Sequence, residues 1–166
     1  MTDQVAAAIG TQYPLLFTYR DTLFGNGFLM EVQAVNGRAL CVREAEDEYW
    51  VYGINPGGMA AHGADPAAAH AAFRKAFSHI LIDLAQASNS FEQFQAAVQT
   101  FFDDTNEGYE ADWRMALPGV QRGEVTLEGI PTVPANSPRS ITVTLKQVEL
   151  VTPQDNSANV QYLLAA

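Results

Sequence analysis

FLMEVQAVNGRALCVREAEDEYWVYGI, residues 28–54, is the part of the sequence with the clearest β-strand pattern. Its first residues, Phe28, Met30 and Val32, alternate with Leu29, Glu31 and Gln33 at a period of two. Met30 and Val32 lie on one face of its first strand. Asn36-Gly37 is the preferred dipeptide of a two-residue type I′ hairpin turn. The stretch therefore predicts one strand before this dipeptide and a returning strand after it.

The returning strand covers residues 38–43 and ends at a charged turn over 44–48. A further strand follows over 49–54, and Asn55-Pro56-Gly57-Gly58 ends it. Residues 15–24 come earlier in the chain and are rich in β-branched and aromatic side chains. Together these segments predict a four-stranded antiparallel meander.

Two helices are predicted after the meander. Asp65-Pro66 is an N-cap followed by proline at the first helical position, and apolar residues then recur at helical spacing to about Ala87. Ser90 and Gln93 form a capping box for a second helix that ends near Asp103. Both helices need an apolar surface, and one face of the meander supplies it.

The last third of the sequence is less regular. Residues 106–121 have mixed character, and 125–127 form a candidate short strand. Residues 141–146 alternate clearly as a strand, and a phase shift after them indicates a β-bulge near Gln147 or a strand that changes layer. Residues 160–164 are the candidate partner of that strand.

The predicted fold is α+β: an antiparallel β-meander with two helices packed on one face and a C-terminal strand pair. No repeat or long linker interrupts the sequence, so residues 1–166 are assigned to a single domain. A separable C-terminal β extension, residues 123–166, is the alternative.

The composition limits the classes of partner. The 166 residues are 48% hydrophobic, as in a globular protein, and carry a net charge of −10. This charge argues against direct binding of nucleic acid or of an anionic membrane, and favours a basic protein partner. The alternative is that the acidity only maintains solubility. With no signal peptide or apolar span in the sequence, we expect a cytoplasmic protein.

No motif in the sequence indicates catalysis, so we expect no catalytic residue, cofactor or metal. The single cysteine, Cys41, is interpreted as a buried thiol, and His62 is the one histidine in a loop position typical of function. Residues 103–114 resemble a calcium-binding EF-hand loop, but Arg114 occupies the position of the essential bidentate glutamate.

The acidic residues are concentrated in two places, each with a tryptophan nearby. Acidic residues interleaved with aromatic ones are typical of a surface that binds a basic protein. The alternative is that the aromatic rings face the core and the acids only solvate turns. The candidate partner-binding residues are Glu44, Glu46, Asp47, Glu48 and Trp50 in the first group, and Asp103, Asp104 and Trp113 in the second.

Residues 28–87 contain a short pattern in which a strand runs into a Pro-Gly turn, followed by a glycine, a polar N-cap and an alanine. The pattern consists of Tyr49-Trp50-Val51-Tyr52, Pro56-Gly57, Gly63, Asp65 and Ala69. It resembles the HicB-like antitoxin domain. The spacer before Gly63 is one residue longer than in that family, and Ala67 replaces an acidic residue.

The resemblance implies a protein, often oligomeric, that neutralises a small basic ribonuclease toxin. Members of the family usually carry a C-terminal DNA-binding module, and this sequence contains none, so autorepression is not expected. The preferred hypothesis is a non-enzymatic acidic module that neutralises a basic protein, as an antitoxin, immunity protein or inhibitor does. The alternatives are an enzyme or small-ligand-binding protein with a pocket near residues 56–63, and a structural assembly subunit.

Overall fold

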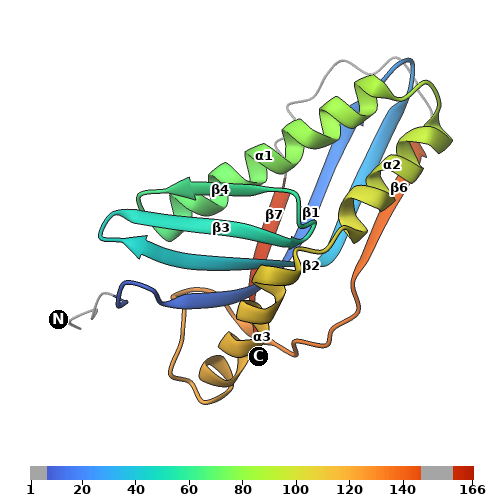
Figure 1. Cartoon of the computed structure of the whole chain (residues 1–166). Helices are drawn as coiled ribbons and strands as arrows, with labels where there is room; N and C mark the ends of the chain where they lie inside the picture. Colours follow the sequence, from blue (N-terminus) through green and yellow to red (C-terminus); the bar gives the residue numbers. More distant parts are fainter. Residues whose placement is uncertain (1–6, 147–158) are drawn as a thin grey trace.

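The computed structural model describes residues 7–146 and 159–166, whose strands form one seven-stranded, mostly antiparallel sheet (Figure 1). The first four strands are β1 (Gln12–Phe24), β2 (Leu29–Ala45), β3 (Glu48–Asn55) and β4 (Ala60–Gly63), and they form the antiparallel pairs β1–β2, β2–β3 and β3–β4. The α+β fold class predicted from the sequence is confirmed. The strand boundaries differ, since the two strands predicted around residue 36 are one strand and β4 was not predicted.

The hairpin turn predicted at Asn36-Gly37 is wrong, because β2 continues through both residues. Asn36 has a φ of 54°, in the left-handed region that asparagine tolerates better than most residues. The register with β1 shifts at this point, since Phe17 pairs with Gly37 and Tyr19 pairs with Ala34. A type I′ turn requires a left-handed backbone conformation. In this protein the same conformation at Asn36 forms a β-bulge inside a long strand.

The bulge divides one edge of β2 between two neighbours. β6 (Ser140–Lys146) pairs with Leu29–Val35, and β3 pairs with residues 38–45. β7 (Asn159–Ala165) pairs antiparallel with β1 instead. The predicted pairing of residues 160–164 with 141–146 is therefore wrong, because these two strands lie on opposite sides of the β1–β2 pair.

The remaining strand, β5 (Thr132–Val133), pairs parallel with β7 and gives the order β4-β3-β2-β1-β7-β5, with β6 beside β2. Residues 125–127, predicted as a short strand, lie in the irregular segment between the last helix and β5. The β-bulge predicted near Gln147 falls outside the described residues.

Both predicted helices form where their capping residues place them. α1 (Pro66–Ala87) begins after Asp65, whose side chain accepts a hydrogen bond from the backbone N–H of Ala68 at 2.7 Å. α2 (Phe91–Asp103) begins after Ser90, whose hydroxyl accepts a hydrogen bond from the N–H of Gln93 at 3.1 Å. Each cap satisfies a backbone donor that the first helical turn leaves free.

α1 and α2 contribute to the main buried cluster on one face of the sheet, as predicted (Figure 1). Phe17 of β1 contacts Phe73 and Phe77 of α1 edge-on, with ring centroids 5.4 and 5.9 Å apart. Tyr19 lies 4.4 Å from Phe77, and its hydroxyl is 2.7 Å from that of Ser78. These aromatic contacts fix α1 across β1.

A third helix, α3 (Glu107–Gln121), was not predicted. Asn106 caps it by accepting a hydrogen bond from the N–H of Tyr109 at 3.2 Å. Trp113 of this helix packs with Leu16 and Leu40 in a second cluster, on the sheet face opposite α1. Only a few apolar residues dock the helix, and Pro118 lies inside it, so its periodicity is weak in the sequence.

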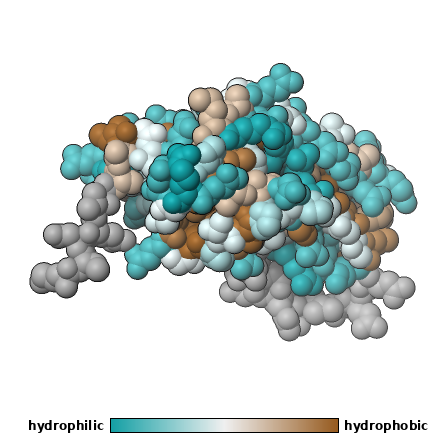
Figure 2. Space-filling model, turned by 90° about the horizontal axis from the view of Figure 1, so that it is seen from below, coloured by the Kyte–Doolittle hydropathy of each residue, from teal (hydrophilic) through white to brown (hydrophobic). Residues whose placement is uncertain are grey.

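Figure 2 shows the molecule from below the orientation of Figure 1. The surface on this side is mostly hydrophilic, with apolar residues in small patches between the polar ones. Among the described residues, no helix has both the length and the apolar character needed to cross a membrane.

Candidate functional site

The first acidic group lies where it was predicted, around the tight turn between β2 and β3. Glu44 is near the end of β2, Glu46 and Asp47 are at the turn, and Glu48 begins β3. All four side chains are exposed. Their charges therefore face solvent, where they can attract a cationic partner.

A row of four stacked aromatic rings lies beside this turn. Trp50 of β3 stacks on His62 of β4 at 4.7 Å between ring centroids, and on Tyr52 at 5.7 Å. Tyr52 in turn stacks on Tyr109 of α3 at 4.1 Å. Trp50 and Tyr52 share one face of β3 because they are two residues apart, and the pairing of Trp50 with His62 places the β4 residue next to them. The row therefore runs from the edge strand β4 to α3.

Two carboxylates are hydrogen-bonded to this row. The indole N–H of Trp50 donates to Glu48 at 2.7 Å, and the Tyr52 hydroxyl donates to Glu44 at 2.9 Å. Partial burial raises the pKa of Tyr52, and the bond to Glu44 raises it further. We call the surface formed by Glu44, Glu46, Asp47, Glu48, Trp50, Tyr52, His62 and Tyr109 the acidic aromatic face.

The second acidic group lies at the other end of β3. Asp103 ends α2 and Asp104 is its C-cap, and the Asp104 carbonyl accepts a hydrogen bond from the N–H of Gly57 at 2.8 Å. The strand between Glu48 and Gly57 separates the groups by more than about 20 Å. Asp103 and Asp104 are exposed, but they do not form one patch with the first group.

Trp113, predicted as a partner-contacting residue, is buried. Its side chain is only 2% exposed, and its indole N–H donates to the carbonyl of Leu15 at 3.2 Å. The ring fills the space between α3 and the sheet, because α3 packs on the face opposite α1.

Tyr52 was not among the predicted contact residues. Its position two residues after Trp50 in a strand is the signal that could have placed both rings on one face.

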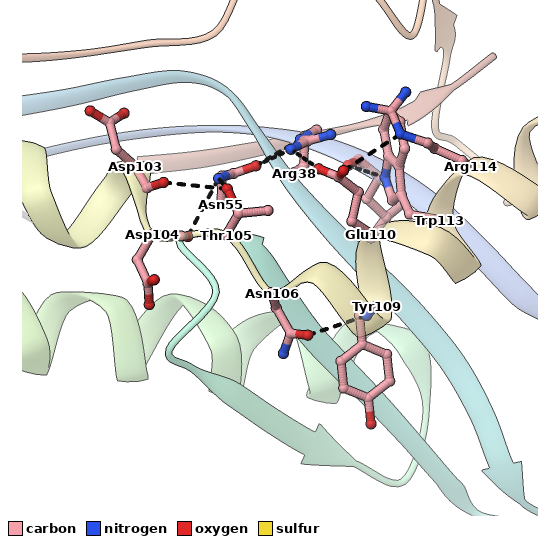
Figure 3. A network of polar contacts seen from close by, with 11 residues as sticks. Arg38, Asn55, Asp103, Asp104, Thr105, Asn106, Tyr109, Glu110, Trp113 and Arg114 are labelled. Atoms are coloured by element: carbon pink, nitrogen blue, oxygen red, sulfur yellow. Dashed lines mark hydrogen bonds and ion pairs between the residues drawn. The ribbon is translucent and has the colours of Figure 1, made fainter.

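A buried polar network joins β2, β3 and α3 next to Trp113 (Figure 3). The side-chain oxygen of Asn55, which is fully buried, accepts a hydrogen bond from Arg38 Nε at 2.8 Å. Its amide nitrogen donates to the hydroxyl of Thr105 at 2.7 Å. Arg38 also pairs with Glu110 at 2.6 Å, and this bond lowers the pKa of Glu110. The network holds the α2–α3 connection against the end of β3.

The remaining candidates from the sequence are Cys41, His62 and the segment that resembles an EF-hand loop. Burial raises the pKa of Cys41 to about 12, so its thiol is a poor nucleophile. His62 is exposed and stacks on Trp50. Within the described ranges, no three His, Cys, Asp or Glu side chains are grouped to hold a metal ion. The segment that resembles an EF-hand loop instead ends α2 and caps α3.

The sequence matches no family model, and neither a curated protein nor a solved structure matches it. The resemblance to HicB-like antitoxins stays a prediction.

Proposed function

We propose that this chain is a non-enzymatic binding protein whose acidic aromatic face engages a basic segment of a protein partner, as an antitoxin, an immunity protein or another inhibitor does. The observation that carries the proposal is the row of stacked rings from His62 to Tyr109 with exposed carboxylates beside it.

The chemistry of this face suits lysine and arginine side chains. Stacked rings present their edges to solvent, and the aliphatic stems of lysine and arginine can lie along such apolar edges. The charged ends then reach the carboxylates of the β2–β3 turn. Tryptophan and tyrosine are also the residues that most often dominate the binding energy of protein interfaces.

The face is held in place before any partner arrives. Trp50 and Tyr52 are each fixed by stacking on two neighbouring rings and by a hydrogen bond to a carboxylate. Side chains that are already ordered lose little rotamer entropy on binding, so more of the contact energy contributes to affinity.

A ligand pocket near residues 56–63 has no comparable support. A Cβ atom at Gly57 would collide with the backbone of Asn106, and one at Gly63 would lie 2.5 Å from the backbone nitrogen of Ala69. Gly57 thus packs closely against the α2–α3 connection and Gly63 against α1, and His62 directs its ring onto Trp50.

The test is affinity capture from lysate of the native host at low and high salt, followed by measurement of the affinity for the captured protein. The variant Glu46→Lys/Asp47→Lys/Glu48→Lys should bind roughly tenfold more weakly or worse, because three attractions worth about 0.5 kcal/mol each become repulsions. Its affinity should also depend less on salt than that of the wild type.

The matched control is Asp83→Lys/Glu92→Lys/Glu124→Lys, which changes the same net charge at three exposed positions on α1, on α2 and after α3. It should retain most of the affinity. Equal weakening of the two triple variants would show that only total charge matters, and unchanged binding by the first variant would assign the contact to another surface.

A further inference from the structure

A pocket of about 420 Å³ lies beside the buried network, between β2, α3 and the loop 134–139. Arg38, Arg114 and Arg139 all line it. The whole chain has only nine lysine and arginine residues and a net charge of −10. Three arginines around one pocket therefore form a local positive site on a negative protein, which favours an anion.

Glu110 neutralises only part of this charge. It pairs with Arg38 at 2.6 Å and lies 3.7 Å from Arg114. Arg139 forms no ion pair with any residue of the described ranges. Three guanidinium groups and one carboxylate leave two positive charges at the pocket.

The three guanidinium groups are close enough to affect one another. Burial lowers the pKa of Arg38, and Arg139 and Arg114 lower it further, while Glu110 raises it. Only 11% of the Arg38 side chain is exposed, so water screens this repulsion weakly. An anion between the guanidinium groups would relieve it.

The wall of the pocket is built by fixed hydrogen bonds. The side-chain amide of Asn36 donates to the carbonyl of Pro138 at 2.7 Å, and the Ser137 hydroxyl donates to the carbonyl of Pro134 at 2.7 Å. The N–H of Ala135 donates to the carbonyl of Ala166 at 2.7 Å. The loop is thus held to both β2 and the end of β7, as in a preformed ligand site.

We propose that this pocket binds a small phosphate-bearing anion between Arg38, Arg114 and Arg139. A phosphate monoester carries roughly two negative charges at neutral pH, which equals the net charge of the pocket. The planar fork of arginine pairs with two phosphate oxygens at once. The ring of Trp113 is covered, with the Arg38 guanidinium 5.4 Å from its centroid, so the pocket recognises the anionic group and not an aromatic base.

The experiment is calorimetric titration of the full chain with pyrophosphate and with inorganic phosphate, at constant ionic strength. Saturable binding to one site is expected, tighter for pyrophosphate because it carries more charge. Arg114→Gln and Arg139→Gln should each weaken binding roughly tenfold, the size expected for losing a charge-assisted hydrogen bond. Both side chains are exposed, so these variants should keep the circular dichroism spectrum of the wild type.

The control is Arg122→Gln, which removes the same charge from an equally exposed side chain outside the pocket. It should bind both anions like the wild type. Absence of saturable binding for both anions would overturn the proposal, as would equal weakening in the control. The triple reversal at residues 46–48 should leave anion binding within a few fold, which keeps this test independent of the proposed protein partner.

Discussion

His70 is a buried histidine whose ring has one nitrogen without a partner. It is 9% exposed, stacks on Tyr162 at 4.3 Å, and its Nε2 has no hydrogen-bond partner among the described residues. Burial lowers its pKa to about 4. The folded protein therefore holds this ring neutral, while the unfolded chain binds a proton near the usual pKa of about 6.5.

The stability of the fold should accordingly fall as the pH drops below about 6.5. A lowered histidine pKa means that the unfolded chain takes up the proton first, so the free energy of unfolding should fall by about 2 kcal/mol between pH 7 and pH 5. Urea unfolding at each pH measures this loss. His70→Phe, which keeps a ring to stack on Tyr162, should lose much less stability over the same range.

The exposed His79 provides the control for this prediction. His79→Gln should keep the pH dependence of the wild type. If His70→Phe also kept the pH dependence of the wild type, protonation of carboxylates, and not of His70, would be the cause of the loss of stability.

The two tryptophans show where sequence reasoning fails at the scale of a residue. Trp50 and Trp113 each lie close to acidic residues in the sequence, yet Trp50 is partly exposed and Trp113 is buried. The difference depends on which face of the sheet receives α3. Nearby charges in the sequence carry no information about that packing.

At the scale of an element, β2 is the unusual strand, because a bulge lets it pair with β1 on one edge and with both β3 and β6 on the other. Gly37 lies at the bulge under the ring of Phe17. A Cβ atom at this position would collide with several carbon atoms of that ring. Gly37 is thus required by close packing inside a strand.

Gly37→Ala should therefore lower the free energy of unfolding by about 1–3 kcal/mol, the usual cost of overpacking a core. Chemical denaturation measures the change. The matched variant is Gly58→Ala, where the new methyl group would meet only Asp104 Oδ2 at 3.8 Å. It should unfold like the wild type, and an equal loss in both variants would argue against the Phe17 contact as the cause.

The three helices differ in how well the sequence predicts them. α1 and α2 have strong N-caps and apolar stripes, and both were found. α3 has an N-cap, Asn106, but few apolar residues, and Pro118 disrupts its pattern. Its stability depends on Trp113, Tyr109 and the bond from Arg38 to Glu110, which are contacts with distant strands.

At the scale of the whole molecule, the C-terminal strands complete the sheet. β6 covers part of one edge of β2, and β7 covers residues 15–20 on the edge of β1. Val143 and Leu164 are buried with the main core, 7% and 1% exposed. The described strands after residue 123 are thus paired with β1 and β2 and share the main core with them.

A chain that ends at Arg122 should consequently lose cooperative unfolding. β1 and β2 would then expose unpaired edges. The free energy of unfolding should fall by more than about 5 kcal/mol, a large part of the stability of an ordinary domain. Urea unfolding followed by tryptophan fluorescence tests this, with addition of the separate fragment 123–166 as the rescue. An unchanged unfolding midpoint in the truncated chain would favour the separable extension.

Features that depend on neighbouring residues could be predicted from the sequence. Strand alternation requires a spacing of two, and the caps at Asp65 and Ser90 act within three residues, so both can be recognised locally. The acidic turn between β2 and β3 could be predicted for the same reason, because consecutive residues form it. Local patterns also led to the wrong hairpin at Asn36-Gly37, because a turn and a bulge use the same backbone conformation.

The contacts between distant segments could be identified only from the folded chain. Strand pairing is set by the burial of whole faces, so β6 and β7 separate to opposite sides of the β1–β2 pair. Stacking of Tyr109 on Tyr52 and the gathering of Arg38, Arg114 and Arg139 depend on where α3 and the loop 134–139 pack. No pattern of nearby residues encodes these contacts, because they follow from the packing energy of the complete sheet.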